Sequence, residues 1–159
     1  MKKESLSRRL KFILVGMGLC GLAVYGWFIP SAGRGLVAGY PEFSGFFWPW
    51  LLFLWATGVP CLIALVPGWK IADSIGKDRS FTQANARRLA LIANLAAGDA
   101  AFFFIGNVAF WLLNMNFPGV VLMSLMVVFV GAAIAVAAAC LSHLVQKAAA
   151  LQEQSDLTI

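Results

Sequence analysis

The sequence is poor in charged residues and in the side chains that usually bind metals. Only 12% of its 159 residues are charged, about half the usual share of roughly 25% in soluble domains, whereas 61% are hydrophobic. The three cysteines and the single histidine show no paired or clustered spacing, so neither a disulfide framework nor a metal centre is indicated. These scarcities exclude a water-soluble globular domain and a disordered chain. Together with a mean hydropathy of +0.84, they indicate an integral membrane protein.

Long runs without charge predict how the chain crosses the bilayer. A hydrocarbon core about 30 Å thick needs about 20 helical residues at 1.5 Å each. We therefore expect a single all-α domain over residues 1–159, an integral membrane four-helix bundle with short external loops. The expected helices cover residues 12–29, 46–67, 89–113 and 119–142, with Pro60 inside the second and a turn-rich break at 114–119 between the last two.

The first apolar run has a second interpretation. A basic N-terminus followed by an apolar run is also the signature of a cleaved signal peptide. This run is longer than the usual apolar region of such a peptide, contains Tyr25 and Trp27, and lacks a small-x-small site near Pro30. We therefore favour a retained first helix, with Trp27 at the far membrane interface.

The distribution of Lys and Arg predicts the orientation, because short cytoplasmic loops accumulate these residues. Ten of the 12 lie before the first helix or in the loop over residues 70–88, whereas one lies in the expected external loops over 31–45 and 114–118. We expect a multi-pass membrane protein with both termini and the middle loop in the cytoplasm. Residues 143–159 are expected to form a cytoplasmic tail that continues the last helix.

Small residues at four-residue spacing predict how the helices pack, because they let helix backbones approach closely in lipid. We expect one packed interior formed by the small faces of the first, third and fourth helices. Those faces comprise Gly16, Cys20 and Gly21; Ala93, Ala97 and Ala101; and Gly131, Ala135 and Ala139.

Asp99 is the one acid in the second half of the predicted membrane region. A charge near the middle of a span costs at least about 2.5 kcal/mol, so this side chain should face the interior. It is either a structural neutral carboxyl bonded to a neighbouring helix, which we favour, or a proton or cation relay or substrate counter-ion. Asn94 and Asn107 do not share a stripe with Asp99 at about 100° per residue, and we expect them to hydrogen-bond between helices.

No catalytic signature is present. The sole histidine, His143, lies at the predicted interface, and Ser-His-acid, phosphate-loop and dinucleotide-binding patterns are all missing. No basic and aromatic residues alternate along the chain to follow a nucleic-acid backbone. The sequence therefore predicts no enzyme activity, no cofactor and no direct contact with nucleic acid, and the lipid bilayer is the expected partner. A homo-oligomer is compatible with these features.

The start of the third helix contains a capping pattern. Thr82 is a credible N-cap with Phe81 before it, and Arg87 and Arg88 should lie at the level of the lipid headgroups. Residues 76–89, with Phe81, Thr82, Asn85 and Leu89 in the order F-[ST]-x-x-N-x-x-x-L, resemble an element of domain-of-unknown-function family 2975. The tail over 149–159 and the Trp27–Pro30 end of the first helix are similar to the same family.

The resemblance implies a four-helix protein of a bacterial cytoplasmic (inner) membrane, of a kind commonly encoded beside a small helix-turn-helix DNA-binding regulator. Our leading hypothesis is therefore a regulatory or interaction protein that binds such a regulator through its cytoplasmic loop and tail. The alternatives are a small transporter or ion-conducting oligomer using Asp99, and an immunity protein against a membrane-active peptide. The candidate partner-binding residues are Phe81, Thr82, Asn85, Arg87, Arg88, Leu151, Glu153, Asp156 and Leu157.

Overall fold

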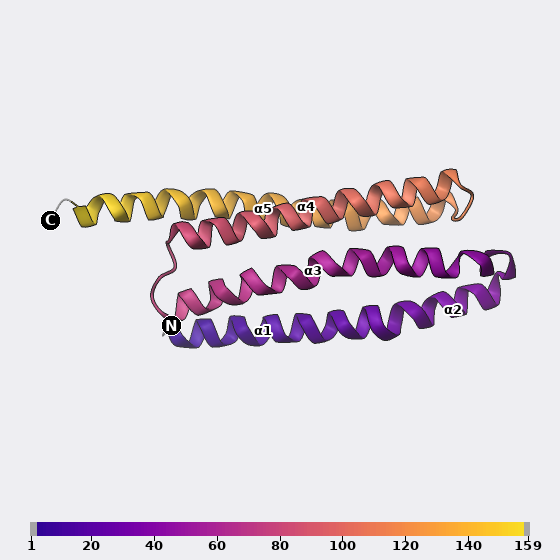
Figure 1. The fold of residues 1–159 in the computed structure, drawn as a ribbon, viewed down its shortest axis with the longest axis horizontal. Helices are drawn as coiled ribbons and strands as arrows, with labels where there is room; N and C mark the ends of the chain where they lie inside the picture. Colours follow the sequence, from indigo (N-terminus) through magenta and orange to yellow (C-terminus); the bar gives the residue numbers. More distant parts are fainter. Residues whose placement is uncertain (1–2, 158–159) are drawn as a thin grey trace.

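The computed structural model describes residues 3–157, and almost all of them are helical (Figure 1). No strand occurs in this part of the chain, which confirms the predicted all-α fold. In chain order the elements are α1 (Lys3–Ala23), the π-helix η1 (Val24–Phe28), α2 (Ile29–Gly39), the 3₁₀-helix η2 (Pro41–Phe46), α3 (Phe47–Gly76), α4 (Gln83–Leu112) and α5 (Pro118–Leu157).

Four helical segments are long and apolar enough to cross a membrane, as predicted. They cover Glu4–Gly39, Pro41–Gly76, Gln83–Leu112 and Pro118–Leu157. The chain is thus a membrane protein whose helices contact the lipid bilayer. The break predicted between the last two helices is confirmed: Asn114 adopts a left-handed backbone with φ 55°, and Pro118 begins α5. A proline at the first helical position loses no backbone hydrogen bond, because the N–H there has no partner within the helix.

The helices are longer than predicted. Residues 31–39 were expected in an external loop and 70–76 in the middle loop, but both stretches are helical. Hydropathy marks where apolar side chains end, whereas the backbone hydrogen bonds of a helix continue through polar residues. The connection between α3 and α4 is consequently short, comprising only residues 77–82.

The first membrane segment contains a π-helix immediately before Pro30. The Ile29 N–H donates to the carbonyl of Val24, which is the five-residue spacing of a π-helix. At that spacing the carbonyl of Tyr25 would need a donor from residue 30, but proline has no N–H. The indole N–H of Trp55 in α3 donates to the Tyr25 carbonyl instead, at 3.0 Å. Side chains of a neighbouring helix thereby satisfy the group that the proline leaves free.

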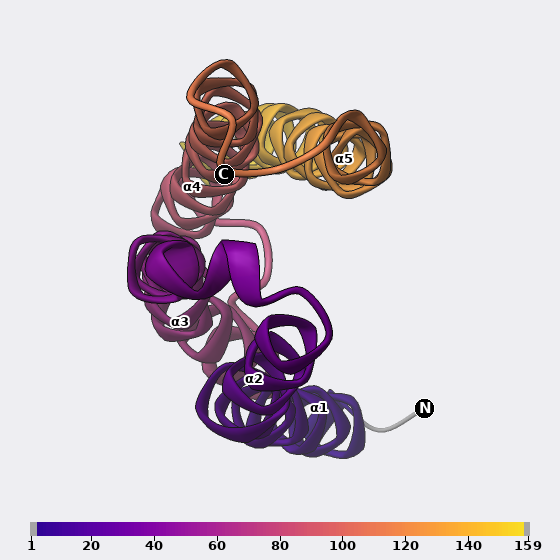
Figure 2. The same ribbon diagram turned by 90° about the vertical axis from the view of Figure 1, so that its right-hand side faces the viewer.

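The helices form a curved layer in which each contacts only its neighbours in the order α1, α3, α4, α5 (Figure 2). Within the described residues, α1 makes no contact with α4 or α5. The most extensive packing lies between α4 and α5. Seen end-on, the layer is an open arc with α1 and α5 at its two ends.

The small-residue faces pack only in part as predicted. Ala93 of α4 and Ala135 of α5 are buried, and a Cβ added to Gly131 would lie 3.1 Å from the Cβ of Ala100. The first helix does not join this packing, so that prediction is wrong: Gly16 and Gly21 have open space around them, and Cys20 is exposed.

The first helix packs on α3 instead, where glycines of α3 provide the space. Side chains of the first membrane segment pack directly onto them: Tyr25 onto Gly58, Leu14 onto Gly68 and Ser7 onto Gly76. At these three contacts the small residue is on α3 and the larger side chain comes from the segment Lys3–Phe28. The reverse arrangement also occurs, because a Cβ added to Gly18 of α1 would lie 3.3 Å from Leu65 of α3.

Candidate functional site

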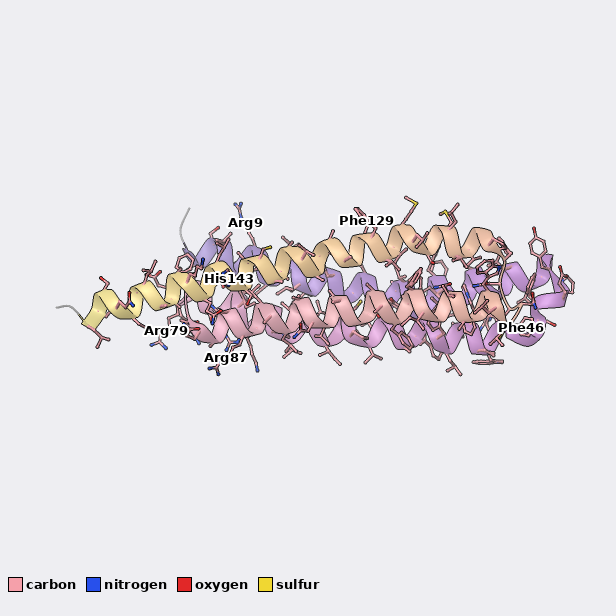
Figure 3. All side chains as sticks on the ribbon, turned by 90° about the horizontal axis from the view of Figure 1, so that it is seen from above. Arg9, Phe46, Arg79, Arg87, Phe129 and His143 are labelled. Atoms are coloured by element: carbon pink, nitrogen blue, oxygen red, sulfur yellow. The ribbon has the colours of Figure 1, made fainter. Side chains whose placement is uncertain are left out.

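Polar and basic side chains gather at one end of the molecule, which we call the basic end. It comprises the start of α1, the last turns of α3, the loop 77–82, the start of α4 and the last turns of α5 (Figure 1). Figure 3 shows Arg79, Arg87 and His143 toward this end and Phe46 at the opposite end.

Asn85 organises the loop 77–82. Its side chain is only 1% exposed. Its amide Nδ2 donates to the carbonyl oxygens of Arg79 at 3.1 Å and Ser80 at 3.0 Å. The predicted N-cap is confirmed, since the Thr82 hydroxyl accepts from the Asn85 backbone N–H at 3.2 Å. The family motif therefore holds the chain in a fixed path between α3 and α4.

Arg88 joins this arrangement to α3. Its Nη1 donates to Asn85 Oδ1 at 2.7 Å and to the Ser74 hydroxyl at 3.1 Å, and lies 3.3 Å from the Lys70 carbonyl oxygen. Arg87, its neighbour in the sequence, is exposed. The prediction placed both arginines at the level of the lipid headgroups. In the structure the two differ, because Arg88 hydrogen-bonds to α3 and Arg87 points to the exposed surface.

Asp73 links α1 to α3. Its carboxylate accepts from Lys11 at 2.9 Å and from Lys77 at 2.8 Å. Asp73 lies beyond the apolar part of α3, and these hydrogen bonds, from Lys77 first and Lys11 second, lower its pKa from 3.8 to about 2. The carboxylate therefore stays charged at neutral pH. The Ser7 hydroxyl adds a buried bond to the Ala72 carbonyl at 2.6 Å.

The last turns of α5 extend past the rest of the molecule (Figures 1 and 3). Ser142 donates to the Ala86 carbonyl at 2.7 Å, and Gln83 of the first α4 turn donates to the Gln146 carbonyl at 3.5 Å. Val145 and Ala149 are the last buried residues of α5. From residue 150 to 157 every side chain is exposed, including the four tail residues singled out from the sequence: Leu151, Glu153, Asp156 and Leu157.

Asp99 faces α3 within the membrane region. Its Oδ2 accepts from the Cys61 thiol at 3.7 Å. Its Oδ1 is buried and has no hydrogen-bond partner among the described residues. A nearby polar pair, in which the Tyr25 hydroxyl lies 3.3 Å from the Thr57 hydroxyl, was not predicted from the sequence. Thr57 and Cys61 are four residues apart and share a face of α3, so their helical spacing could have revealed this polar stripe.

The two asparagines of the third span are not brought together with Asp99. Asn94 is exposed, whereas Asn107 is buried and donates to the carbonyl of Phe103 in its own helix at 2.8 Å. The prediction that Asn107 bonds between helices is therefore wrong. Aromatic packing occupies the α3–α4 contact nearby, where the Phe53 ring lies 5.9 Å from that of Phe103.

Together, four membrane-crossing helices, an intramembrane acid and an ordered basic end define a helical multi-span membrane protein. The model of the family described as "Protein of unknown function (DUF2975)" matches residues 32–159, and the chain belongs to this family, as its motifs predicted. The chain is also similar to "Uncharacterized membrane protein YoaS" of Bacillus subtilis (strain 168), with 27% identity over 160 residues and 99% of each chain covered. No solved structure matches the chain.

Proposed function

We propose that the protein is a membrane-anchored interaction protein that binds a soluble protein through the tail of α5 and the loop 77–82. The observation that carries this proposal is the tail itself. It is helical through residue 157, extends beyond its neighbours, and exposes Leu151 by 66% and Leu157 by 87%. Apolar side chains on a charged, water-facing helix are a common means of binding another helix or groove.

The fixed loop supports the proposal. Thr82, Asn85 and Arg88 hold its path, so Phe81 is presented on an ordered backbone with 56% of its surface exposed. A partner then loses little entropy from the loop on binding, because the bound conformation is already formed. Arg87 on α4 and the tail acids Glu153 and Asp156 supply exposed charges of both signs.

The resemblance suggests a small helix-turn-helix DNA-binding regulator as the partner, held at the inner face of a bacterial cytoplasmic membrane. The concentration of Lys and Arg at the basic end supports a cytoplasmic location for this end. In this proposal the protein regulates transcription indirectly, by keeping the regulator at the membrane.

Co-purification tests this function. The full-length protein in detergent is to be expressed with the helix-turn-helix protein encoded beside it. We expect the pair Leu151→Asp and Leu157→Asp to lose the partner. The pair Gln152→Asp and Ser155→Asp adds the same charge to the same helix and should retain it. Equal recovery with both variants, or none with the unaltered protein, would contradict the proposal.

A second candidate function is conduction of protons or cations by an oligomer that uses Asp99. The observation in its favour is the Oδ1 atom, which is buried and unbonded within the described part of the chain. In liposomes, Asp99→Asn should abolish a flux that Asn94→Ala leaves unchanged, because Asn94 is exposed. A flux that survives Asp99→Asn would eliminate this candidate.

A further inference from the structure

A polar cavity of about 410 Å³ lies between the last turns of α3, the loop 77–82 and the start of α4. Its volume falls within the range of roughly 300–1,000 Å³ that is typical of small-ligand pockets. It is lined by four cations together with one acid and one indole: Lys70, Lys77, Arg79, Arg88, Asp73 and Trp69. We call it the basic pocket.

The basic pocket has a surplus of positive charge. Among the described residues, Asp73 is the one carboxylate that lines it, and Asp73 is already bonded by Lys77 from within the pocket and by Lys11 from α1. The Arg88 Nη1 bonds are made to neutral acceptors, the oxygens of Ser74 and Asn85. No carboxylate among residues 3–157 pairs with Lys70 or Arg79. Lys70, Arg79 and Arg88 thus face one cavity, and none of the three forms a salt bridge with a carboxylate of residues 3–157.

The pocket lies where the membrane segments end. Its α3 residues follow the apolar stretch 46–67 directly, and Arg88 directly precedes the apolar stretch that begins at residue 89. Trp69 is 44% exposed, and the Lys11 ammonium stands 5.3 Å from its ring centroid. Tryptophan and basic side chains concentrate at the level of the lipid headgroups, which is also where lipid phosphates lie.

We propose that the basic pocket binds a phosphate group, and that this group is carried by the headgroup of an anionic phospholipid. Guanidinium and ammonium groups form charge-assisted hydrogen bonds with phosphate oxygens, and Arg can do so through two nitrogens at once. Trp69 lies on the wall of the pocket, where its ring can contact the apolar part of such a lipid. A soluble phosphate offers the same oxygen atoms as a lipid headgroup, and the experiment below distinguishes the two ligands. This proposal is independent of the partner-binding tail.

The test uses the full-length protein in nanodiscs or detergent. Bound phosphatidylglycerol and phosphatidylcholine are counted by native mass spectrometry for the double variant Lys70→Gln, Arg79→Gln. Among the described residues, Lys70 and Arg79 form hydrogen bonds only through their backbone atoms, so folding should be retained. The matched control is Arg9→Gln, Lys147→Gln, which removes the same charge from exposed sites outside the pocket.

We expect phosphatidylglycerol to bind more tightly than phosphatidylcholine. Its affinity should fall roughly fivefold for each pocket cation removed, and less than about twofold in the control. A parallel titration with inorganic phosphate identifies the source. If the double variant weakens binding of inorganic phosphate but the protein does not prefer either lipid, the pocket binds a soluble phosphate. That result supports the phosphate site and overturns its assignment to a lipid. Equal losses in the double variant and the control, or no binding of either anion, overturn the proposal.

Discussion

Asn85 is the residue on which the connection between α3 and α4 depends. A single buried amide bonds two loop carbonyls and the guanidinium of Arg88, which in turn bonds α3. Buried polar groups that lose their partners are costly, so these contacts act as one unit. Hydrogen bonds therefore hold this loop in place.

Replacing Asn85 should destabilise the protein strongly. Asn85→Ala leaves the Arg79 and Ser80 carbonyls without this donor and removes one acceptor of Arg88 Nη1, so we expect a loss of about 3 kcal/mol in the free energy of unfolding. Thermal or denaturant unfolding in detergent measures the change. The control Asn94→Ala removes an exposed amide from the same helix and should cost within about 0.5 kcal/mol. Similar losses for both variants would contradict the role assigned to Asn85.

Sequence rules at this scale succeed where the interaction is local. Thr82 could be identified as an N-cap because capping involves residues three apart in the chain. The bond from Arg88 to Ser74 spans 14 residues and a change of helix, and no periodicity indicates it. The same limit applied to Asp99, whose neighbour Cys61 is 38 residues away.

At the scale of the element, η1 shows how a proline is accommodated within a membrane segment. The π-helix shifts the bonding so that the Tyr25 carbonyl is the one left without a backbone donor, and Trp55 supplies the donor from α3. Bonds of this kind between membrane helices contribute about 0.6 kcal/mol on average and up to about 1.7 kcal/mol.

This account predicts a coupling between two residues in different helices. Trp55→Phe should cost about 1 kcal/mol, because it removes the indole N–H and keeps an aromatic ring. Pro30→Ala restores a backbone N–H, and in that background Trp55→Phe should cost much less. A double-mutant cycle on unfolding in detergent measures the coupling. Trp27→Phe, at an exposed position of η1, serves as the control. If the losses from Trp55→Phe and Pro30→Ala simply add, the Trp55 indole does not replace the donor that Pro30 lacks.

The four membrane helices could be predicted because each contains a long run without charge. Their ends could not, since residues 31–39 and 70–76 contain Gly, Ser, Lys and Asp but still satisfy their backbone within a helix. Polar residues mark the limit of the apolar surface. They do not mark the last hydrogen bond.

At the scale of the whole molecule, the chain consists of two hairpins joined side by side. One comprises α1, α2 and α3, and the other comprises α4 and α5; among residues 3–157, α3 and α4 are the helices that pack against each other between the two hairpins. The uncharged runs along the sequence predict four helices, but the order in which the helices pack depends on contacts between residues far apart in the sequence. The glycines at positions 58, 68 and 76 determine that α1 packs on α3, although the sequence showed equally plausible small faces elsewhere.

The arrangement predicts which loops share a side of the membrane. The two described chain ends and the loop 77–82 lie at the basic end, opposite η2 and the connection between α4 and α5 (Figure 1). We expect alkaline phosphatase to be inactive when fused after Lys77, and active when fused after Glu42 or Asn116, because basic loops remain in the cytoplasm. Fusions of green fluorescent protein should give the reciprocal pattern. An active phosphatase at Lys77 would reverse the orientation.

The position of Asn85 and Arg88 in the chain has a consequence for biosynthesis. Both residues follow the loop, so the first hairpin is translated in full before the side chains that fasten it to the second hairpin exist. The Ser74 hydroxyl and the Lys70 carbonyl of α3, which bond each other, can therefore be joined by Arg88 only after the start of α4 has emerged from the ribosome. The joint between the hairpins is thus a late event in assembly, set by the direction of translation.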